Sequence, residues 1–495
     1  MKTPSIKISL LPILTLLLLL GLNIYLFKDA AAAGPNQIAL LITCALTTVI
    51  GVFYLKIPYE RIEKSILENL NYSLHAIIIL LVVGSLISIW IMSGIVPCLI
   101  YYGLKILSPT IFLPASCVIC AVVSLATGSS WSTTGTIGIA LMGIGQSQGI
   151  SPGIVAGSII SGAYLGDKMS PLSDTTNLAP AMAGVDLFTH IKHMVQTSVP
   201  AFILSLIIFS LIGIFGEHNL QDSHQVDQLI QVLDTHFNLG LHILIIPLFV
   251  FILVIKKMPA LPALVLATSL AALSIPIFQK DLLHSLFIQY NTQSAYKMII
   301  QVAANGLSLE THNNVVNQLI NRGGMVSMLN TVWLIIAAMI FGGVMEGTKM
   351  LDSLAVTLLQ KVKKSHELIM ATVASCIGTN ILACDQYISI VLPGRIFKSS
   401  FEKFNIEGKY LSRTLEDAGT VTGVLIPWNS CGAYHAGILG ISTFTYMPYC
   451  FFNILSPCMA ILLAYLTFSK KLINQKDLHP FDKMNLERKQ FQEIL

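Results

Sequence analysis

Residues 166–177 read Gly-Asp-Lys-Met-Ser-Pro-Leu-Ser-Asp-Thr-Thr-Asn, a polar stretch inside the otherwise apolar region 153–193. Pro171 cannot donate a backbone hydrogen bond and disfavours a helical conformation at Ser170, so the pattern predicts a helix that is interrupted there. Just after the interruption, Asp174, Thr175 and Asn177 offer oxygen atoms, the ligand type that suits a small hard cation. Two structural alternatives stay open: Asp167 and Lys168 as an interfacial ion pair, and Ser173-Asp174 as a helix cap.

The composition places this stretch in a membrane. Of 495 residues, 54% are hydrophobic and only 11% are charged, with a mean hydropathy of +0.74. A soluble protein carries about 25% charged residues, so this chain cannot cover itself with a polar surface in water. The composition excludes a soluble enzyme, a disordered scaffold and a secreted disulfide domain. The net charge of +4 is too small to indicate a nucleic-acid partner.

Apolar runs long enough to cross about 30 Å of hydrocarbon mark the uninterrupted spans. They lie at about 8–27, 37–55, 74–97, 197–216, 241–255, 261–279, 326–346 and 447–467. Four further apolar regions are broken by glycine, proline and polar residues: 111–145, 153–193, 366–392 and 414–442. The first run resembles a signal peptide, but its length favours a retained helix.

The distribution of basic residues predicts how the broken regions are threaded. Both 347–365 and 393–413 are rich in lysine, yet one apolar region separates them. If both are cytoplasmic, 366–392 must enter the membrane and return on the same side, as a re-entrant hairpin. The same argument makes 111–145 a hairpin that enters from the outside. We therefore predict an all-α polytopic membrane protein with ten crossings, two re-entrant hairpins and both termini cytoplasmic. Most of the 29 lysines and arginines then lie inside.

Residues 74–216 and 326–467 follow one plan in opposite orientations. Each has a span, an interfacial stretch, a hairpin, a broken crossing and a final span, at an offset of about 250 residues. Inverted repeats with broken helices are typical of secondary transporters. The predicted organisation is N-terminal helices at 1–73, the first repeat, connecting helices with a long external segment at 217–325, the second repeat, and a basic cytoplasmic tail at 468–495.

The second repeat carries its own polar clusters. Glu416 and Asp417 lie at the predicted cytoplasmic end of a crossing, where a funnel or capping role is as plausible as ion binding. Pro427 predicts a second break, with Asn429 and Ser430 directly after it. The predicted hairpin tips are the hydroxyl-rich residues 127–136 and the Gly-Thr-Asn sequence at 378–380, with Asp385 further on. Such side chains are costly in lipid unless they face a cavity or bond to a neighbouring helix.

Three segments resemble the signature sequences of NhaC-type sodium/proton antiporters of the ion transporter superfamily. They are TGSSWSTTGTIGIALMGIG (127–145), ISGAYLGDKMSPLSDTTNLAPAMAGVDLFTHIKHM (160–194) and LSRTLEDAGTVTGVLIPWNSCGAYHAGILG (411–440). The resemblance implies exchange of cytoplasmic Na⁺ for external H⁺ in a bacterial inner membrane, a moving transport domain beside a scaffold, and a homodimer. Na⁺ and H⁺ would be the transported ions, with Li⁺ a further candidate and no cofactor.

The resemblance also implies which residues bind the substrate. In the family the hairpin tips and broken helices hold it, which corresponds here to Ser129, Ser130, Thr379 and Asn380 at the tips and to Asp174, Thr175, Asn429 and Ser430 at the breaks. We assign Na⁺ to Asp174, Thr175, Asn429 and Asn380. With Asn177, the carboxylates Asp167, Asp417 and Asp385 complete the candidate ion- and proton-binding set.

Two alternatives remain open at this point. The family includes exchangers of malate and lactate, so a sodium- or proton-coupled exchanger of small carboxylates or amino acids is the second hypothesis. An organic anion calls for a positive charge at the midplane, and we expect no lysine or arginine there. An intramembrane aspartyl protease is disfavoured because Tyr164-Leu165-Gly166-Asp167 lacks the first glycine of a GxGD motif. We therefore expect a transporter and not an enzyme.

Overall fold

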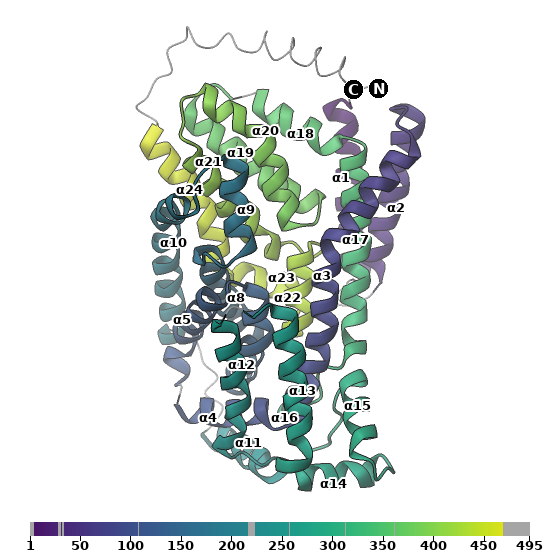
Figure 1. Cartoon of the computed structure of the whole chain (residues 1–495), viewed down its shortest axis with the longest axis vertical. Helices are drawn as coiled ribbons and strands as arrows, with labels where there is room; N and C mark the ends of the chain where they lie inside the picture. The colour runs from purple at the N-terminus through teal and green to yellow at the C-terminus, as the bar shows by residue number, and fades with distance from the viewer. Residues whose placement is uncertain are drawn as a thin grey trace.

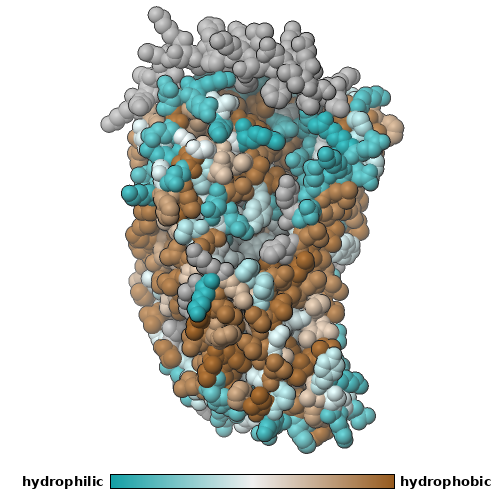
Figure 2. Space-filling view, viewed as in Figure 1, coloured by the Kyte–Doolittle hydropathy of each residue, from teal (hydrophilic) through white to brown (hydrophobic). Residues whose placement is uncertain are grey.

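The computed structural model describes residues 4–27, 31, 34–106, 108–215, 223–256, 258–311, 313–360 and 362–468. All regular structure in these ranges is helical, which confirms the predicted class of all-α membrane protein. The helices form an elongated bundle (Figure 1), and an apolar belt separates two hydrophilic ends on the face shown in Figure 2. Apart from Phe468, the predicted basic tail lies outside the described residues.

Seven of the described helices are long and apolar enough to cross a bilayer, and two bent pairs raise this number to nine. The seven are α1 (Ile6–Phe27), α2 (Pro35–Val49) with its continuation η2 (Ile50–Tyr54), α5 (Pro109–Thr127), α10 (Leu187–Phe215), α13 (Ala260–Phe278), α17 (Leu329–Gly347) and α24 (Phe451–Phe468). The bent pairs add α3 (Tyr59–Met92), followed by α4 (Ile95–Ile106), and α12 (Ile245–Ile255), preceded by α11 (Ser223–His236).

The predicted ten crossings differ from this count for a physical reason. The broken crossings are too short and too polar in each half to qualify by length and hydropathy. The helix α5 qualifies by composition, but its chain turns back instead of continuing. If α5 is removed from the nine candidate spans and the two broken crossings are added, the number of crossings is ten.

The first hairpin covers the predicted region 111–145. The helix α5 ends at Gly128, which has a left-handed φ of 69°, and the chain returns through α6 (Ser130–Thr133), η3 (Thr134–Gly138) and α7 (Ile139–Ser147). A Cβ atom on Gly145 would lie 2.7 Å from the Phe112 ring, so the end of α7 lies beside the start of α5. The segment therefore enters and leaves on the same side.

The second hairpin consists of α19 (Ser365–Leu382) and α20 (Gln386–Lys403). The preceding helix α18 (Met350–Gln360) carries Asp352, which lies 3.9 Å from the Arg395 guanidinium in the second half of α20. The helix α20 therefore returns to the side on which α19 begins, and α18 to α21 share one end of the bundle (Figure 1).

Both predicted helix breaks are present. The helix α8 (Pro152–Met169) stops before Ser170 and α9 (Asp174–Ala183) resumes after Pro171. In the second repeat, α21 (Gly408–Leu415) continues as a π-helical turn, η6 (Glu416–Thr420), and a 3-10 turn, η7 (Gly423–Leu425), before α22 (Ser430–Leu439) starts beyond Pro427. Each repeat thus contains a span, a short helix, a hairpin, a broken crossing and a final span, running in opposite directions.

The remaining helices connect these parts. The chain between the repeats forms the pair α12 and α13 and then short helices at the end opposite α18 (Figure 1). These short helices are α14 (Lys280–Gln289), α15 (Ala295–Asn305) and α16 (Asn314–Ile320). In the second repeat, the short helix α23 (Thr443–Tyr446) precedes α24.

The helices α5 and α8 pack side by side at very close range. A Cβ atom on Gly162 would lie 2.0 Å from the carbonyl oxygen of Cys117, and the Ser124 hydroxyl donates to the carbonyl of Ala163 at 2.6 Å. Small residues permit this approach in a membrane, where lipid tails are as apolar as leucine and contact area drives association. This packing fixes the position of the first hairpin against the first broken crossing.

We expect Gly162→Ala to lower the free energy of unfolding by about 1–3 kcal/mol, because the methyl group has no space against the α5 backbone. The matched control is Gly21→Ala, where no atom lies within 4 Å of the added carbon. The control should change stability by no more than about 1 kcal/mol. Thermal denaturation of the purified protein measures both, and equal melting temperatures would contradict the packing.

The second hairpin predicts which residues share a side of the membrane. Lys363 before α19 and Glu402 near the end of α20 are both exposed, as is Gln293 at the opposite end of the bundle. In a Cys458→Ser background, which removes the exposed cysteine, Lys363→Cys and Glu402→Cys should react with a membrane-impermeant maleimide from one side and Gln293→Cys from the other. Labelling of the first two from opposite sides would show that α19 and α20 contain a single crossing.

Candidate ion-binding site

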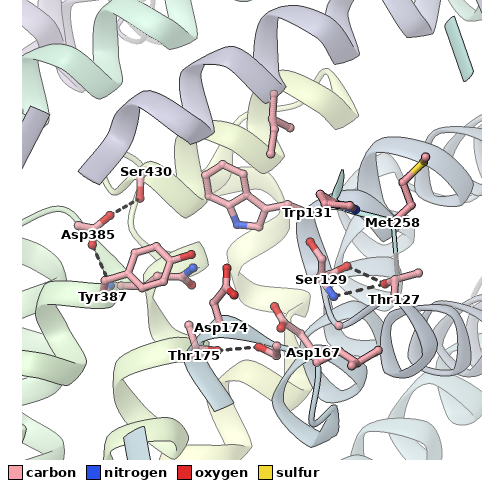
Figure 3. Close-up of a pocket in the computed structure, with 16 residues that line it drawn as sticks. Thr127, Ser129, Trp131, Asp167, Asp174, Thr175, Met258, Asp385, Tyr387 and Ser430 are labelled. Carbon is pink, nitrogen blue, oxygen red and sulfur yellow. Dashed lines mark hydrogen bonds between the residues drawn. The ribbon is translucent and has the colours of Figure 1, made fainter. Parts of the chain in front are cut away.

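A cavity of about 350 Å³ lies where both hairpin tips meet the first helix break and the start of α22 (Figure 3). Its wall contains three carboxylates, several hydroxyl groups and two aromatic rings. The lining residues are Ile79, Thr127, Gly128, Ser129, Trp131, Asp167, Leu172, Ser173, Asp174, Thr175, Met258, Pro259, Asp385, Gln386, Tyr387 and Ser430. Six predicted site residues are among them: Ser129, Asp167, Asp174, Thr175, Asp385 and Ser430.

The tip of the first hairpin is bonded to the first broken crossing through Asp167. Its Oδ2 atom accepts hydrogen bonds from the Ser130 hydroxyl at 2.6 Å and from the Ser130 backbone N–H at 3.1 Å. Gly128 is required beside this contact, because a Cβ atom there would lie 2.7 Å from the backbone of Leu172. Asp167 therefore accepts from the free backbone N–H group at the start of α6, and its carboxylate lines the cavity.

Asp385 has the corresponding place at the second hairpin tip. It caps α20 by accepting from the backbone N–H groups of Tyr387 at 2.8 Å and Ile388 at 3.2 Å. The Ser430 hydroxyl donates to its other oxygen at 3.4 Å, which joins the second tip to the second break. Ser129 caps α6 in the same manner, so each hairpin turns at a capped helix start facing the cavity.

Asp174 differs from the other two carboxylates in that it is free of partners within the described residues. It is the first residue of α9 and is exposed to the cavity, where Figure 3 shows it between Tyr387 and Ser129. Ser173 occupies the cap position without a side-chain hydrogen bond to the helix. The start of a helix also favours a negative charge. Asp174 is therefore the cavity carboxylate that can take up a cation without losing a protein contact.

Behind Thr175 lies a buried carboxylate that does not line the cavity. The Thr175 hydroxyl donates to Glu416 Oε1 at 3.0 Å and lies 3.1 Å from the Ser173 hydroxyl. Glu416 is fully buried in η6. The helix continues past Glu416 and Asp417 and protein surrounds both, so neither carboxylate is exposed as an entry funnel would require.

Asp417 is the centre of an ion-pair cluster between the repeats. Its Oδ1 atom accepts from the Lys168 ammonium group, from Thr197 at 2.9 Å and from Ser456 at 3.0 Å. Arg413 Nε lies 3.8 Å from Oδ2, and both basic side chains are buried.

One open alternative and one expectation from the sequence fail at this cluster. Lys168 pairs with Asp417 and not with the adjacent Asp167, because a helical neighbour points its side chain to another face. The expected absence of lysine and arginine from the centre is also wrong, since Lys168 and Arg413 are both buried there. An offset of 249 residues between Lys168 and Asp417, close to the repeat offset, was the available signal.

The two asparagines of the second repeat bond to each other. Asn429 Nδ2 donates to the carbonyl and to the side-chain oxygen of Asn380, each at 3.0 Å, and Asn429 Oδ1 caps α22 at the N–H of Cys431. Asn380 Nδ2 donates to the carbonyl of Gly419 at 2.6 Å. The four residues assigned to one Na⁺ thus occupy two places: Asp174 and Thr175 on the cavity wall, and this amide pair behind the second tip.

The other predicted residues have local partners. The Thr379 hydroxyl bonds within α19 to the carbonyl of Ser375, and Asn177 is exposed and donates to the carbonyls of Pro171 and Ser173. Trp131, Gln386 and Tyr387 line the cavity and were not predicted. Their position next to predicted tip residues was the only sequence signal for them.

The cavity offers oxygen ligands for a hard cation. Within the described chain, no three His, Cys, Asp or Glu side chains come together as a metal-binding group. A Na⁺ ion at Asp174 would therefore combine carboxylate oxygen with hydroxyl, amide and water oxygens. Among the described residues, no lysine, arginine or histidine lines the cavity.

We expect Lys168→Gln and Asp417→Asn each to lower stability by about 3 kcal/mol, since each leaves a buried charge without its partner. The double variant should lose less than the sum of the two. Thermal denaturation of the purified variants measures the coupling, and additive losses would contradict a specific ion pair.

The comparisons with known proteins agree with this geometry. The sequence profile of the Na⁺/H⁺ antiporter family matches residues 162–468. The chain is 42% identical to the Na⁺/H⁺ antiporter NhaC of Alkalihalophilus pseudofirmus over 86% of this chain and 89% of that protein. It is 36% identical to the malate-2H⁺/Na⁺-lactate antiporter of Bacillus subtilis, over 92% and 93% of the two chains.

A third relative is the arginine/ornithine antiporter ArcD of Halobacterium salinarum, with 33% identity over 94% of this chain and 92% of that protein. Residues 162–468, which match the family profile, include both helix breaks, the second hairpin and the ion-pair cluster. The chain belongs to the Na⁺/H⁺ antiporter family.

Proposed function

We propose that this protein exchanges cytoplasmic Na⁺ for external H⁺ across a bacterial inner membrane. The family assignment supports Na⁺ and H⁺ as the transported ions. The positive-inside distribution supports cytoplasmic termini. Li⁺ resembles Na⁺ in its preference for oxygen ligands and is a further candidate ion.

The observation that carries this proposal is the set of three carboxylates around one cavity. Asp167 and Asp385 hold the two hairpin tips, and Asp174 faces the space between them without a partner in the described chain. A carboxylate that binds Na⁺ must be ionised, so a proton and a sodium ion compete for it. Exchange follows if the cavity opens to one side at a time.

The arrangement of the hairpins supports alternating access. They enter from opposite sides and their tips meet at one cavity, so each can act as a gate toward its own side. We propose an elevator-like movement in which the hairpins and broken crossings travel against the long helices α3 and α17. A homodimer, with the scaffold as its interface, fits this movement.

The second candidate is a coupled exchanger of small carboxylates or amino acids. Two relatives carry such substrates in their names. A cavity of about 350 Å³ also exceeds the space of a single ion, since a water molecule occupies about 30 Å³. The lining residues that the structure describes, however, offer no basic side chain for a carboxylate, and Lys168 and Arg413 lie beside Asp417.

Flux in proteoliposomes distinguishes the two functions. A preset pH gradient is monitored with a fluorescent amine while NaCl, LiCl, KCl, sodium malate, sodium lactate or arginine is added. Sodium/proton antiport predicts that NaCl dissipates the gradient without any organic substrate. A gradient that collapses only in the presence of an organic substrate would support the second function.

We expect Asp174→Asn to lower the rate of Na⁺-dependent proton movement by at least about tenfold, or about 1.4 kcal/mol, because the cavity loses its unpartnered negative charge. The matched control is Asp186→Asn in the exposed turn after α9, which should keep normal exchange. Normal exchange in Asp174→Asn would remove this residue from the site.

A further inference from the structure

Beside the acidic cavity of Figure 3 lies a second, apolar cavity of about 330 Å³. Among the described residues of its wall there is no ionisable side chain, and the polar side chains are Trp90 and hydroxyl residues of the first hairpin. Thr127, Ser129 and Met258 line both cavities, so the two spaces adjoin at the first hairpin tip. Each volume lies within the range of about 300–1,000 Å³ that is typical of sites for small organic ligands.

The apolar cavity lies between two parts of the protein that the proposed movement displaces against each other. On one side, Val123 and Ile137 belong to the first hairpin. On the other side, Leu248 belongs to α12 and Leu264 to α13. The helix α13 packs along α3, and α12 packs against α13, so this side belongs with the long helices. A molecule in the apolar cavity therefore contacts both the hairpin and the helices that it moves against.

The acidic cavity suits the head group of an organic cation. Its described wall contains three carboxylates, including Asp174, and no basic side chain. The rings of Trp131 and Tyr387 line the same space (Figure 3), and aromatic rings attract quaternary ammonium groups through their faces. Trp131 is fixed by Tyr434, whose ring stacks on it at 4.0 Å and whose hydroxyl donates to its backbone carbonyl.

We propose that the two cavities together bind an amphiphilic organic cation. Its ammonium head occupies the acidic cavity in place of Na⁺, and its alkyl chain passes Met258 into the apolar cavity. The Met258 side chain is unbranched and has three rotatable bonds, so it can move aside at this boundary. The bound cation connects the first hairpin to α12 and α13 and blocks exchange. The competition with Na⁺ rests on the proposed antiport, whereas the binding site itself does not.

The alkyl chain should add affinity because it leaves water for an apolar space. Tetramethylammonium and n-hexyltrimethylammonium carry the same permanent charge on similar head groups, and they differ in the length of one chain. Burial of one methylene group improves an equilibrium constant about fourfold, so burial of two already gives more than about tenfold. We therefore expect the hexyl compound to bind at least about tenfold more tightly than tetramethylammonium.

The test measures the initial uptake of radioactive sodium into proteoliposomes with a preset pH gradient. A quaternary ammonium ion has no proton to release, so it does not collapse the gradient as a weak base does. Both compounds should raise the apparent KM for Na⁺ without lowering the maximal rate, the hexyl compound at a concentration at least about tenfold lower. Isothermal titration of the purified protein should give the same ratio of Kd values, and it requires no exchange activity.

Three variants locate the alkyl chain. Val123→Phe should reduce the ratio to about fourfold or less, the contribution of one methylene group, because the ring fills the apolar cavity. If this variant does not fold, Leu244→Trp replaces it, since Leu244 lines the same cavity and is only partly buried in η4 (Leu241–Leu244) before α12. The matched control is Val122→Phe. Val122 is the neighbouring residue on α5, is exposed and lines neither cavity, so the control should keep the wild-type ratio.

Equal binding of the two ammonium ions would overturn the proposal, and a lipid chain that keeps the apolar cavity filled would give this result. An undiminished ratio in Val123→Phe and Leu244→Trp would also overturn it, because the chain would then lie in the bilayer. If the wild-type protein shows no Na⁺-dependent proton movement but titration gives the expected ratios, the proposed antiport fails and the binding site stands.

Discussion

The structure depends on one constraint: backbone that leaves a helix inside the membrane must find hydrogen-bond partners within the protein. In each repeat, the hairpin tip and the helix break supply these partners to each other. Ser130 N–H bonds to Asp167, Ser430 N–H to the carbonyl of Cys384, and the Trp428 indole to the carbonyl of Ile381. Each hairpin tip and the break of the same repeat therefore stabilise each other, and hydrogen bonds from Tyr434 to the carbonyl of Trp131 and from Thr175 to Glu416 join the two pairs beside the cavity.

The same constraint arranges the charges. Carboxylates that cap helix starts at the hairpin tips, such as Asp385, are held by backbone N–H groups and still present an edge to the cavity. The basic side chains are kept away from the cavity by Asp417, which binds Lys168 and lies close to Arg413. The result is a polar, acidic space in which the described wall residues include no basic side chain. This separation of charges suits a site that selects a small cation.

Much of the fold could be predicted because its signals are local. Pro171 and Pro427 define the breaks, Gly128 defines a hairpin turn, and the lysine-rich loops define the threading. The neighbours of each charged residue could not be predicted in the same manner. Lys168 and Asp417 are far apart in sequence, and the packing of both α8 and η6 against α24 brings them together. Six of the predicted site residues line one cavity, but the separation of the Asn380–Asn429 pair from the cavity wall depends on side-chain geometry that spacing does not contain.

The central claim is that Na⁺ and H⁺ exclude one another in this cavity. Isothermal titration of the purified protein with NaCl, in buffers of different ionisation enthalpy, counts the protons released for each Na⁺ bound. The account predicts proton release on Na⁺ binding, with an affinity for Na⁺ that weakens as the pH falls. Sodium binding without proton release, at an affinity that does not change with pH, would contradict it.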